Sequence, residues 1–271
     1  MTTPSTEWRR GLISYDRPRI MGVLNLTPDS FSDTIRYSGK AAVDRVFEME
    51  DEGADIIDIG GESTRPGSLP VSPEEEIARI IDVIRIAAPS VNVPISVDTM
   101  HPETAEAALN AGAEMINDVS GIRDERMADL AASAGVPVVI MHMHGVPKTM
   151  QASTMSGDAV SRISEFFDAV CAYAELKGIK RNRIILDPGI GFGKTFQQNT
   201  EIIKGLRTFG RKFPILTGTS MKSFLPYAYP DLPRPDASIL SAAECIRNGA
   251  NIVRVHDVKR TLDALKDEKF E

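Results

Sequence analysis

Length, composition and charge describe an ordinary globular chain and exclude several classes of protein. The chain has 271 residues, of which 42% are hydrophobic and 25% charged, so it can bury one large core and does not resemble a disordered protein. The net charge of -7 provides no basic surface for nucleic acid. No apolar run approaches the roughly 18 residues of a membrane span, and residues 1–18 lack the apolar core of a signal peptide. We therefore expect a cytoplasmic protein without nucleic acid or membrane partners.

One unit repeats along the chain: a short apolar, β-branched run, a polar loop, and a segment with apolar residues at helical spacing. Eight runs are predicted to be strands: 20–26, 54–61, 93–99, 114–120, 136–142, 183–189, 213–220 and 250–258. Strands that are buried on both faces and separated by helices form parallel sheets. Eight of them in about 250 residues predict an α/β fold, a single (β/α)8 TIM barrel. An open doubly wound sheet is the structural alternative.

No proline-rich or low-complexity linker divides the chain. We therefore predict one domain over residues 1–271, with 1–18 as an N-terminal extension. Cys171 and Cys245 lie among apolar positions of helical patterns, which is typical of small buried thiols and not of a disulfide framework or a metal site.

Two helices have clear boundaries in the sequence. Ser72 and Pro73, followed by three glutamates at 74–76, predict a helix N-terminus with acids at its positive end. Its buried stripe is predicted to be Ile77, Ile80, Ile81 and Ile84. A second helix is predicted to begin at His101-Pro102-Glu103 and to end at Gly112.

Polar residues follow or end every predicted strand. In barrels of this type the chemistry lies at the carboxyl ends of the strands. One polar residue there can simply cap a helix or bond its own loop, but eight together predict a functional site. The residues are Asn25, Asp58, Asp98, Asn117, His142, Asp187, Ser220 and the pair Arg254 and His256.

These side chains indicate the kind of ligand that the site binds. Asp98, Asn117 and Asp187 offer acceptors that suit a flat heterocycle with a guanidine-like edge, and Lys222 adds a donor. Arg254 and His256 alternate along the eighth strand and therefore point the same way. Because barrels often bind phosphate beside strands seven and eight, the pair is predicted to bind an anion. The alternative is a salt bridge to the acidic residues of the same rim.

Two long polar loops, 27–39 with Phe31 and 62–72 with Arg65, are predicted to close over substrate, unless they are surface decoration. The glycine-rich run 187–195 is not a P-loop, because Pro188 stands where that motif requires glycine. Its glycines are predicted to let the backbone approach a ligand.

The possible metal ligands of the sequence distinguish zinc from magnesium. His142 and His144 have no accompanying zinc-ligand pattern, so zinc is disfavoured. A Mg²⁺ ion held mainly by phosphate oxygens and by Asn25 is the favoured cofactor.

Seven motifs in order, over almost the whole chain, resemble those of dihydropteroate synthases. The most specific are LNLTPDSFSD and GGESTRPG; the runs are MGVLNLTPDSFSD, GADIIDIGGESTRPG, ISVDT, MINDVSG, MHMHG, ILDPGIGFGKT and VRVHDV. The resemblance implies a dissociative condensation of 6-hydroxymethyl-dihydropterin pyrophosphate with p-aminobenzoate, which releases pyrophosphate. It also implies a homodimer.

The resemblance assigns residues to each ligand. Asp98, Asn117, Asp187 and Lys222 would hold the pterin, with Met141 and Phe192 beside its ring. Asn25, Arg254 and His256 would hold the pyrophosphate and Mg²⁺. Thr64, Arg65, Pro66 and Ser220 would place the p-aminobenzoate. Asn25, Asp98, Arg254 and His256 are the residues expected to act in catalysis.

One position departs from the family pattern, which reads Ser-Arg-Lys after strand seven where this chain has Ser220-Met221-Lys222. The favoured interpretation is that Met221 lies on the side of its loop away from substrate. The alternative is an acceptor without a carboxylate, such as a ribosylated arylamine. A paralogue without synthase activity, a methyltransferase of the same barrel type and a pterin-binding regulatory protein are the remaining alternatives.

Overall fold

Eight parallel strands form the centre of the molecule. The computed structural model describes residues 5–9, 11–27, 39–150, 152, 154–210 and 212–266. The strands are β3 (Arg19–Asn25), β4 (Ile56–Gly60), β5 (Ile95–Asp98), β6 (Met115–Asp118), β7 (Val138–Met141), β8 (Ile184–Asp187), β9 (Leu216–Thr217) and β10 (Ile252–Val255). Their order in the sheet is β8-β7-β6-β5-β4-β3-β10-β9. A parallel bridge between Leu186 and Ile215 joins the two ends of this order, which confirms the predicted barrel.

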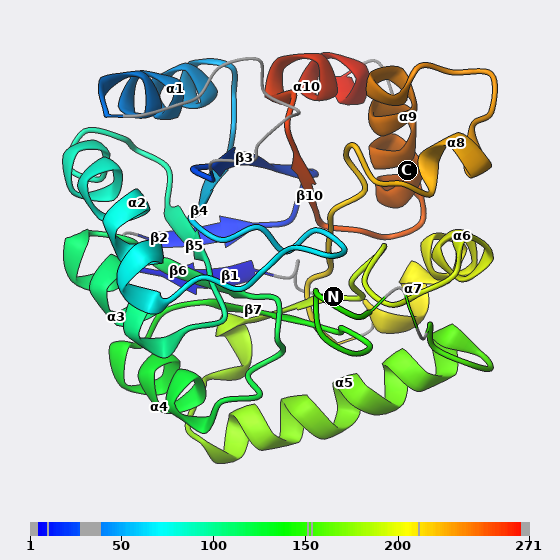
Figure 1. Ribbon diagram of the computed structural model, residues 1–271, viewed down its shortest axis with the longest axis horizontal. Helices are drawn as coiled ribbons and strands as arrows, with labels where there is room; N and C mark the ends of the chain where they lie inside the picture. Colours follow the sequence, from blue (N-terminus) through cyan, green and yellow to red (C-terminus); the bar gives the residue numbers. More distant parts are fainter. Residues whose placement is uncertain are drawn as a thin grey trace.

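Helices surround the strands as a ring (Figure 1). They are α1 (Lys40–Asp51), α2 (Pro73–Ala87), α3 (Pro102–Ala111), α4 (Glu125–Ala134), α5 (Ala159–Leu176), α6 (Phe196–Lys204), α7 (Leu206–Phe209), α8 (Leu225–Ala228), α9 (Arg234–Arg247) and α10 (Val258–Lys266), with a 3-10 turn at Arg181–Arg183. None of the helices in the described residues is long and apolar enough to cross a membrane.

The boundaries predicted for α2 and α3 are correct. The Ser72 side chain accepts a hydrogen bond from the backbone N–H of Glu75, and α3 ends at Gly112, whose φ is 118°. The predicted stripe of α2 is partly wrong, because Ile77 and Ile81 are only half-buried while Val83 and Ala87 are buried. Glu76 is buried as well, so only two of the three glutamates of the first turn lie at the surface.

The N-terminal extension is a hairpin at the amino ends of the barrel strands. Strands β1 (Ser5–Trp8) and β2 (Gly11–Ser14) pair antiparallel. Ile13 and Tyr15 belong to one buried cluster with the first inward-facing layer of the barrel, Met21, Ile56, Met115, Val139, Ile185, Leu216 and Ile252. This end of the barrel is therefore filled by apolar side chains.

The strand alternation places the polar layer at the other end. Because successive side chains point to opposite faces of a strand, the residues two positions after that apolar layer also face inward. They are Val23, Asp58, Asn117, Met141, Asp187, Gly218 and Arg254, with Asp98 in register beside Asn117. The functional chemistry is thus concentrated at the carboxyl ends of the strands.

Both cysteines are free and buried, as predicted. Burial raises the pKa of Cys171 and of Cys245 to about 12, so neither thiol ionises near neutral pH.

Candidate active site

A cavity of about 550 Å³ opens at the carboxyl ends of the strands. Every residue that the sequence and the resemblance assigned to a ligand lines it: Asn25, Thr64, Arg65, Pro66, Asp98, Asn117, Met141, Asp187, Phe192, Ser220, Lys222, Arg254 and His256. Of the two predicted lid loops, 62–72 lies within the described residues and contributes Thr64, Arg65 and Pro66. The other, 27–39, lies largely outside them, since Phe31 and the rest of 28–38 are not described.

Arg254 lies between two buried carboxylates. Its Nε is 2.6 Å from Asp58 Oδ2, and its Nη2 is 2.6 Å from Asp98 Oδ2. Burial alone would lower the pKa of Arg254, but the carboxylates of Asp58 and Asp98 raise it. In this structure Arg254 therefore forms the salt bridge to the acidic rim that the sequence left open as an alternative. Its guanidinium balances the charge of two carboxylates.

Asp98 and Asn117 each keep an acceptor for a ligand. Asp98 Oδ1 is buried and, within the described part of the chain, has no hydrogen-bond partner, and burial raises the pKa of Asp98 to about 7. Asn117 Nδ2 donates to Asp58 Oδ2 at 3.0 Å. Because the amide nitrogen is engaged there, the amide oxygen is the atom that Asn117 can offer to an N–H donor.

Asp187 and Lys222 form the other side of the same slot. Asp187 Oδ1 accepts from the backbone N–H of Gly189 at 2.7 Å, and burial raises the pKa of Asp187 to about 6. Burial lowers the pKa of Lys222 to about 8. Lys222 Nζ lies 4.0 Å from the centre of the Phe192 ring. The slot therefore combines three acceptors, one cationic donor and an aromatic wall.

His256 is held by Ser220 at the anion side of the cavity. Its Nδ1 is 2.9 Å from Ser220 Oγ, and its backbone N–H donates to the same oxygen at 3.4 Å. Burial and the nearby Arg254 lower the pKa of His256 to about 4. The imidazole is therefore neutral at pH 7 in the unliganded protein. If the Ser220 hydroxyl donates to Nδ1, then Nε2 carries the ring hydrogen and can donate a hydrogen bond to an anion.

A fully buried lysine holds the loop that carries Phe192. Lys194 Nζ donates to the carbonyl oxygens of His142, Gly189 and Phe192 at 3.0, 2.7 and 3.0 Å. The backbone comes so close there that a Cβ at Gly189 would lie 2.0 Å from His142 O. The tight turn predicted for this run is present: Gly189 lies against the backbone after β7, and Gly191 lines the cavity.

His142 is not part of the site, which corrects the sequence prediction. Strand β7 ends at Met141, which faces the cavity, while the His142 ring packs edge-on against Phe166 of α5 at 5.1 Å. Burial lowers the pKa of His142 to about 3. Within the described residues, the group that could hold a metal ion is Glu62, Glu76 and His101, and it includes neither His142 nor His144.

The positions of two residues in the cavity wall differ from those expected from the sequence. Met221 lines the cavity, so the favoured interpretation that it lies away from substrate is wrong. Arg234, the first residue of α9, also lines the cavity and was missed. The sequence does contain an indication of this role. A cation at the positive N-terminal end of a helix is electrostatically unfavourable, so an arginine there suggests a function outside the helix.

The two residues are linked through the backbone. The N–H of Met221 donates to Ser238 Oγ at 2.9 Å, and this hydroxyl donates to Arg234 O at 2.7 Å. The other lining residues that the sequence analysis did not assign are Val23, Thr27, Glu62, Ser63, Val119, Met150, Ile190, Gly191, Gly218 and Ser223.

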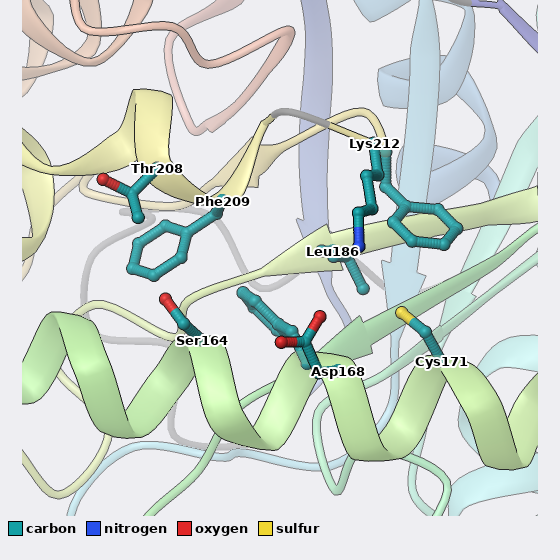
Figure 2. A pocket seen from close by; sticks show the side chains of 9 residues that line it. Ser164, Asp168, Cys171, Leu186, Thr208, Phe209 and Lys212 are labelled. Atoms are coloured by element: carbon teal, nitrogen blue, oxygen red, sulfur yellow. The ribbon is translucent and has the colours of Figure 1, made fainter.

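A second cavity, of about 230 Å³, lies between α5 and α7 (Figure 2). Its walls are mainly apolar, with Phe167, Leu186, Phe209 and Phe213, and Ser164, Asp168 and Lys212 add polar groups. It contains none of the residues predicted to bind a ligand.

A closed barrel with a polar cavity at the carboxyl ends of its strands is the architecture of a TIM-barrel enzyme. The chain belongs to the pterin binding enzyme family, whose model matches residues 21–256. It is 40% identical over 258 residues to dihydropteroate synthase of Escherichia coli K12, covering 94% of this chain and 92% of that protein.

Solved structures agree in fold and sequence. The Xanthomonas albilineans dihydropteroate synthase with 4-aminobenzoic acid has a TM-score of 0.89 and 39% identity, covering 98% of this chain and 97% of that one. The Burkholderia cenocepacia enzyme complexed with 7,8-dihydropteroate has a TM-score of 0.86 and 39% identity, covering 98% and 96%.

Proposed function

We propose that this chain is a dihydropteroate synthase, a transferase of folate biosynthesis. It condenses 6-hydroxymethyl-7,8-dihydropterin pyrophosphate with p-aminobenzoate to give 7,8-dihydropteroate and pyrophosphate. The support is the likeness over nearly the whole length to enzymes of that name, including structures that hold 7,8-dihydropteroate and 4-aminobenzoic acid. The observation that carries the proposal is the slot of three acceptors beside Arg254 and His256.

The pterin fits the acceptor slot by its hydrogen-bonding pattern. Its amino group and ring N–H groups are donors for Asp98 Oδ1, the Asn117 amide oxygen and Asp187. Lys222 donates to the ring oxygen or a ring nitrogen, and Met141 and Phe192 cover the ring. The partnerless Asp98 Oδ1 is the strongest single indication of a donor in the ligand, because buried acceptors are normally satisfied.

Arg254 and His256 are proposed to bind the pyrophosphate. The set also fits Mg²⁺, because Asn25 lines the same cavity and offers a neutral amide oxygen, and Mg²⁺ takes most of its ligands from phosphates and water. When bound, Mg²⁺ supplies additional positive charge to the pyrophosphate oxygens.

Catalysis follows from where charge develops. As the C–O bond to pyrophosphate breaks, the leaving oxygens gain negative charge, and Arg254 and the His256 N–H stabilise them more strongly than in the ground state. The carboxylates of Asp98 and Asp187 favour the cation that remains on the pterin methylene. The neutral arylamine then forms the C–N bond and loses a proton to water, so no covalent nucleophile is required.

Thr64, Arg65, Pro66 and Ser220 are proposed to place p-aminobenzoate. Arg234 lines the same cavity, and we propose that it supplies a second positive charge for the carboxylate, where Met221 brings none. A ribosylated arylamine remains the second candidate acceptor, because the loop arginine of the family pattern is absent.

Substitutions at these two positions test the carboxylate assignment. We expect Arg234→Met to raise the KM for p-aminobenzoate roughly fivefold and Met221→Arg to lower it roughly threefold, since one exposed ion pair contributes at most about 1 kcal/mol. Neither substitution should change the KM for p-aminobenzamide, which lacks the charge. Equal effects on both acceptors would contradict the assignment.

The pH dependence tests the pterin slot. With pKa values of about 7 for Asp98 and about 8 for Lys222, Asp98 is ionised above the first value and Lys222 is protonated below the second. We expect kcat/KM for the pterin pyrophosphate to fall below pH 7 and above pH 8, because this ratio reports the free enzyme. The residual activity of Asp98→Asn should have its acidic limb moved from about pH 7 to about pH 6, where Asp187 becomes protonated; an unchanged limb would assign it elsewhere.

The decisive experiment measures pyrophosphate release with Mg²⁺ and no amine, p-aminobenzoate or a ribosylated arylamine phosphate. Release that requires p-aminobenzoate and yields dihydropteroate supports the proposal. Release only with the ribosylated arylamine would assign the second function. Tight pterin binding without pyrophosphate release would indicate a pterin-binding protein or a methyltransferase paralogue.

A homodimer and a cytoplasmic location stay predictions, as does the lack of membrane and nucleic acid partners. Light scattering of the purified chain tests the first.

A further inference from the structure

Three potential metal ligands from separate elements meet beside the active-site cavity. Glu62 follows β4, Glu76 belongs to α2, and His101 precedes α3. One ligand atom from each residue lies within 4.8 Å of the other two. Glu62 also lines the active-site cavity, and it begins the segment 62–72 that carries Thr64 and Arg65.

The cluster brings two buried carboxylates together beside a single imidazole. Glu76 is 0% exposed and Glu62 is 7% exposed. His101 Nε2 is 3.0 Å from Glu62 Oε2. Arg79, the nearest arginine on α2, instead donates to Gly61 O and pairs with Glu75. A divalent cation would match the charge of the two carboxylates.

One carboxylate oxygen points to a missing ligand. Thr99 Oγ1 donates to Glu76 Oε2 at 2.7 Å, and the Thr104 side chain lies beside the same carboxylate. Within the described part of the chain, Glu76 Oε1 is buried without a well-formed hydrogen bond. A buried carboxylate oxygen without a partner is costly. The Thr99 bond is the kind of outer contact that orients a metal-binding carboxylate while leaving its other oxygen available.

The spacing and access suit a transition metal. Zinc–ligand bonds of about 2.0–2.2 Å in a tetrahedral site place two ligand atoms roughly 3.3–3.6 Å apart. The three ligand atoms, now within 4.8 Å of one another, would therefore draw together when an ion binds. The His101 side chain is 26% exposed, which gives an ion and a coordinating water a route to the cluster. An imidazole ligand favours zinc over magnesium, and the two carboxylates also suit manganese.

We propose that Glu62, Glu76 and His101 form a binding site for a divalent transition-metal ion. The ion joins the start of the segment 62–72 to α2 and α3, and it thereby positions Thr64 and Arg65 at the cavity. Metal binding at this cluster does not depend on pterin transfer and is measured without it.

Calorimetric titration of the EDTA-treated full chain with Zn²⁺, and separately with Mn²⁺, tests the site. We expect one ion per chain with micromolar affinity, Zn²⁺ tighter than Mn²⁺, and no competition from millimolar Mg²⁺. Glu76→Gln and His101→Asn should each weaken binding at least tenfold. Glu75→Gln, on the exposed side of the same helix, is the matched control and should not. Thermal melting of each variant without metal establishes that it is folded.

Hydrogen exchange measures the second part of the proposal. Zn²⁺ should slow amide exchange over residues 61–66 in the unmodified chain and leave it unchanged in His101→Asn. A Kd weaker than 100 μM, or binding that survives both substitutions, would overturn the site. Binding without slower exchange at 61–66 would overturn its positioning role.

Discussion

An Arg254→Met variant is expected to lose about 10²–10³-fold in kcat/KM, the loss typical of removing a principal charge stabiliser from a transition state. Arg254 is proposed to bind the leaving pyrophosphate, and it also neutralises Asp58 and Asp98. Removing one partner of a buried ion pair typically costs about 3–5 kcal/mol. The free energy of unfolding should therefore fall together with the activity. Urea denaturation and steady-state kinetics measure the two effects.

The double variant Arg254→Met with Asp58→Asn separates these effects. Asp58 is fully buried and does not line the cavity, so neutralising it should recover much of the lost stability without restoring activity. Arg254→Lys keeps the charge but cannot span both carboxylates, and it should retain more stability than the methionine variant. Recovery of activity in the double variant would show that Arg254 acts only by holding the acids.

Gly189→Ala is expected to destabilise the chain by at least about 4 kcal/mol, the range of severe steric changes in a core. The added Cβ would lie 2.0 Å from the carbonyl oxygen of His142, and the φ of Gly189 is 66°. Relief of this contact moves the backbone that donates to Asp187 Oδ1 and accepts from Lys194. Affinity for the pterin should fall as well. Chemical denaturation and calorimetry with a pterin ligand measure the two losses.

Gly157→Ala is the matched control. Its φ of 78° is similarly unfavourable for alanine, but no atom of the described residues lies within 4 Å of the new Cβ. It should cost only the backbone strain, about 1–2 kcal/mol, and leave pterin affinity unchanged. Equal losses at Gly157 and Gly189 would mean that φ, and not the contact with His142, determines the effect.

The barrel and most of the cavity could be predicted because both depend on local periodicity. A period of two along each strand puts Asn117, Asp187 and Arg254 on the inner face, whatever their partners are. The same rule fails at the strand end for His142, because β7 stops at Met141 and the following residue turns outward to Phe166. Strand ends are the positions where a shift of one residue exchanges the inner and outer faces.

Contacts between distant segments could not be predicted in the same way. In the sequence, Glu76 has the position of an exposed acidic residue in the first turn of a helix. In the structure, α2 packs so that the Glu76 carboxylate accepts a hydrogen bond from Thr99 and lies near His101. Arg234 reaches the cavity because α9 begins beside the loop after β9, which no spacing in the sequence reveals. The pairing of Arg254 with Asp58 spans 196 residues, and it was one of two alternatives that the sequence left open.

The hairpin β1–β2 has a kinetic consequence. Because Ile13 and Tyr15 fill the amino end of the barrel, the opening that the described residues leave for substrates and products lies at the carboxyl end. Asp98, Asn117 and Asp187, which are proposed to bind the pterin, are buried there, whereas Arg65 and Arg234 are exposed. An arylamine seated at the entrance would obstruct the way in, so the pterin pyrophosphate has to enter first and dihydropteroate has to leave before the next cycle.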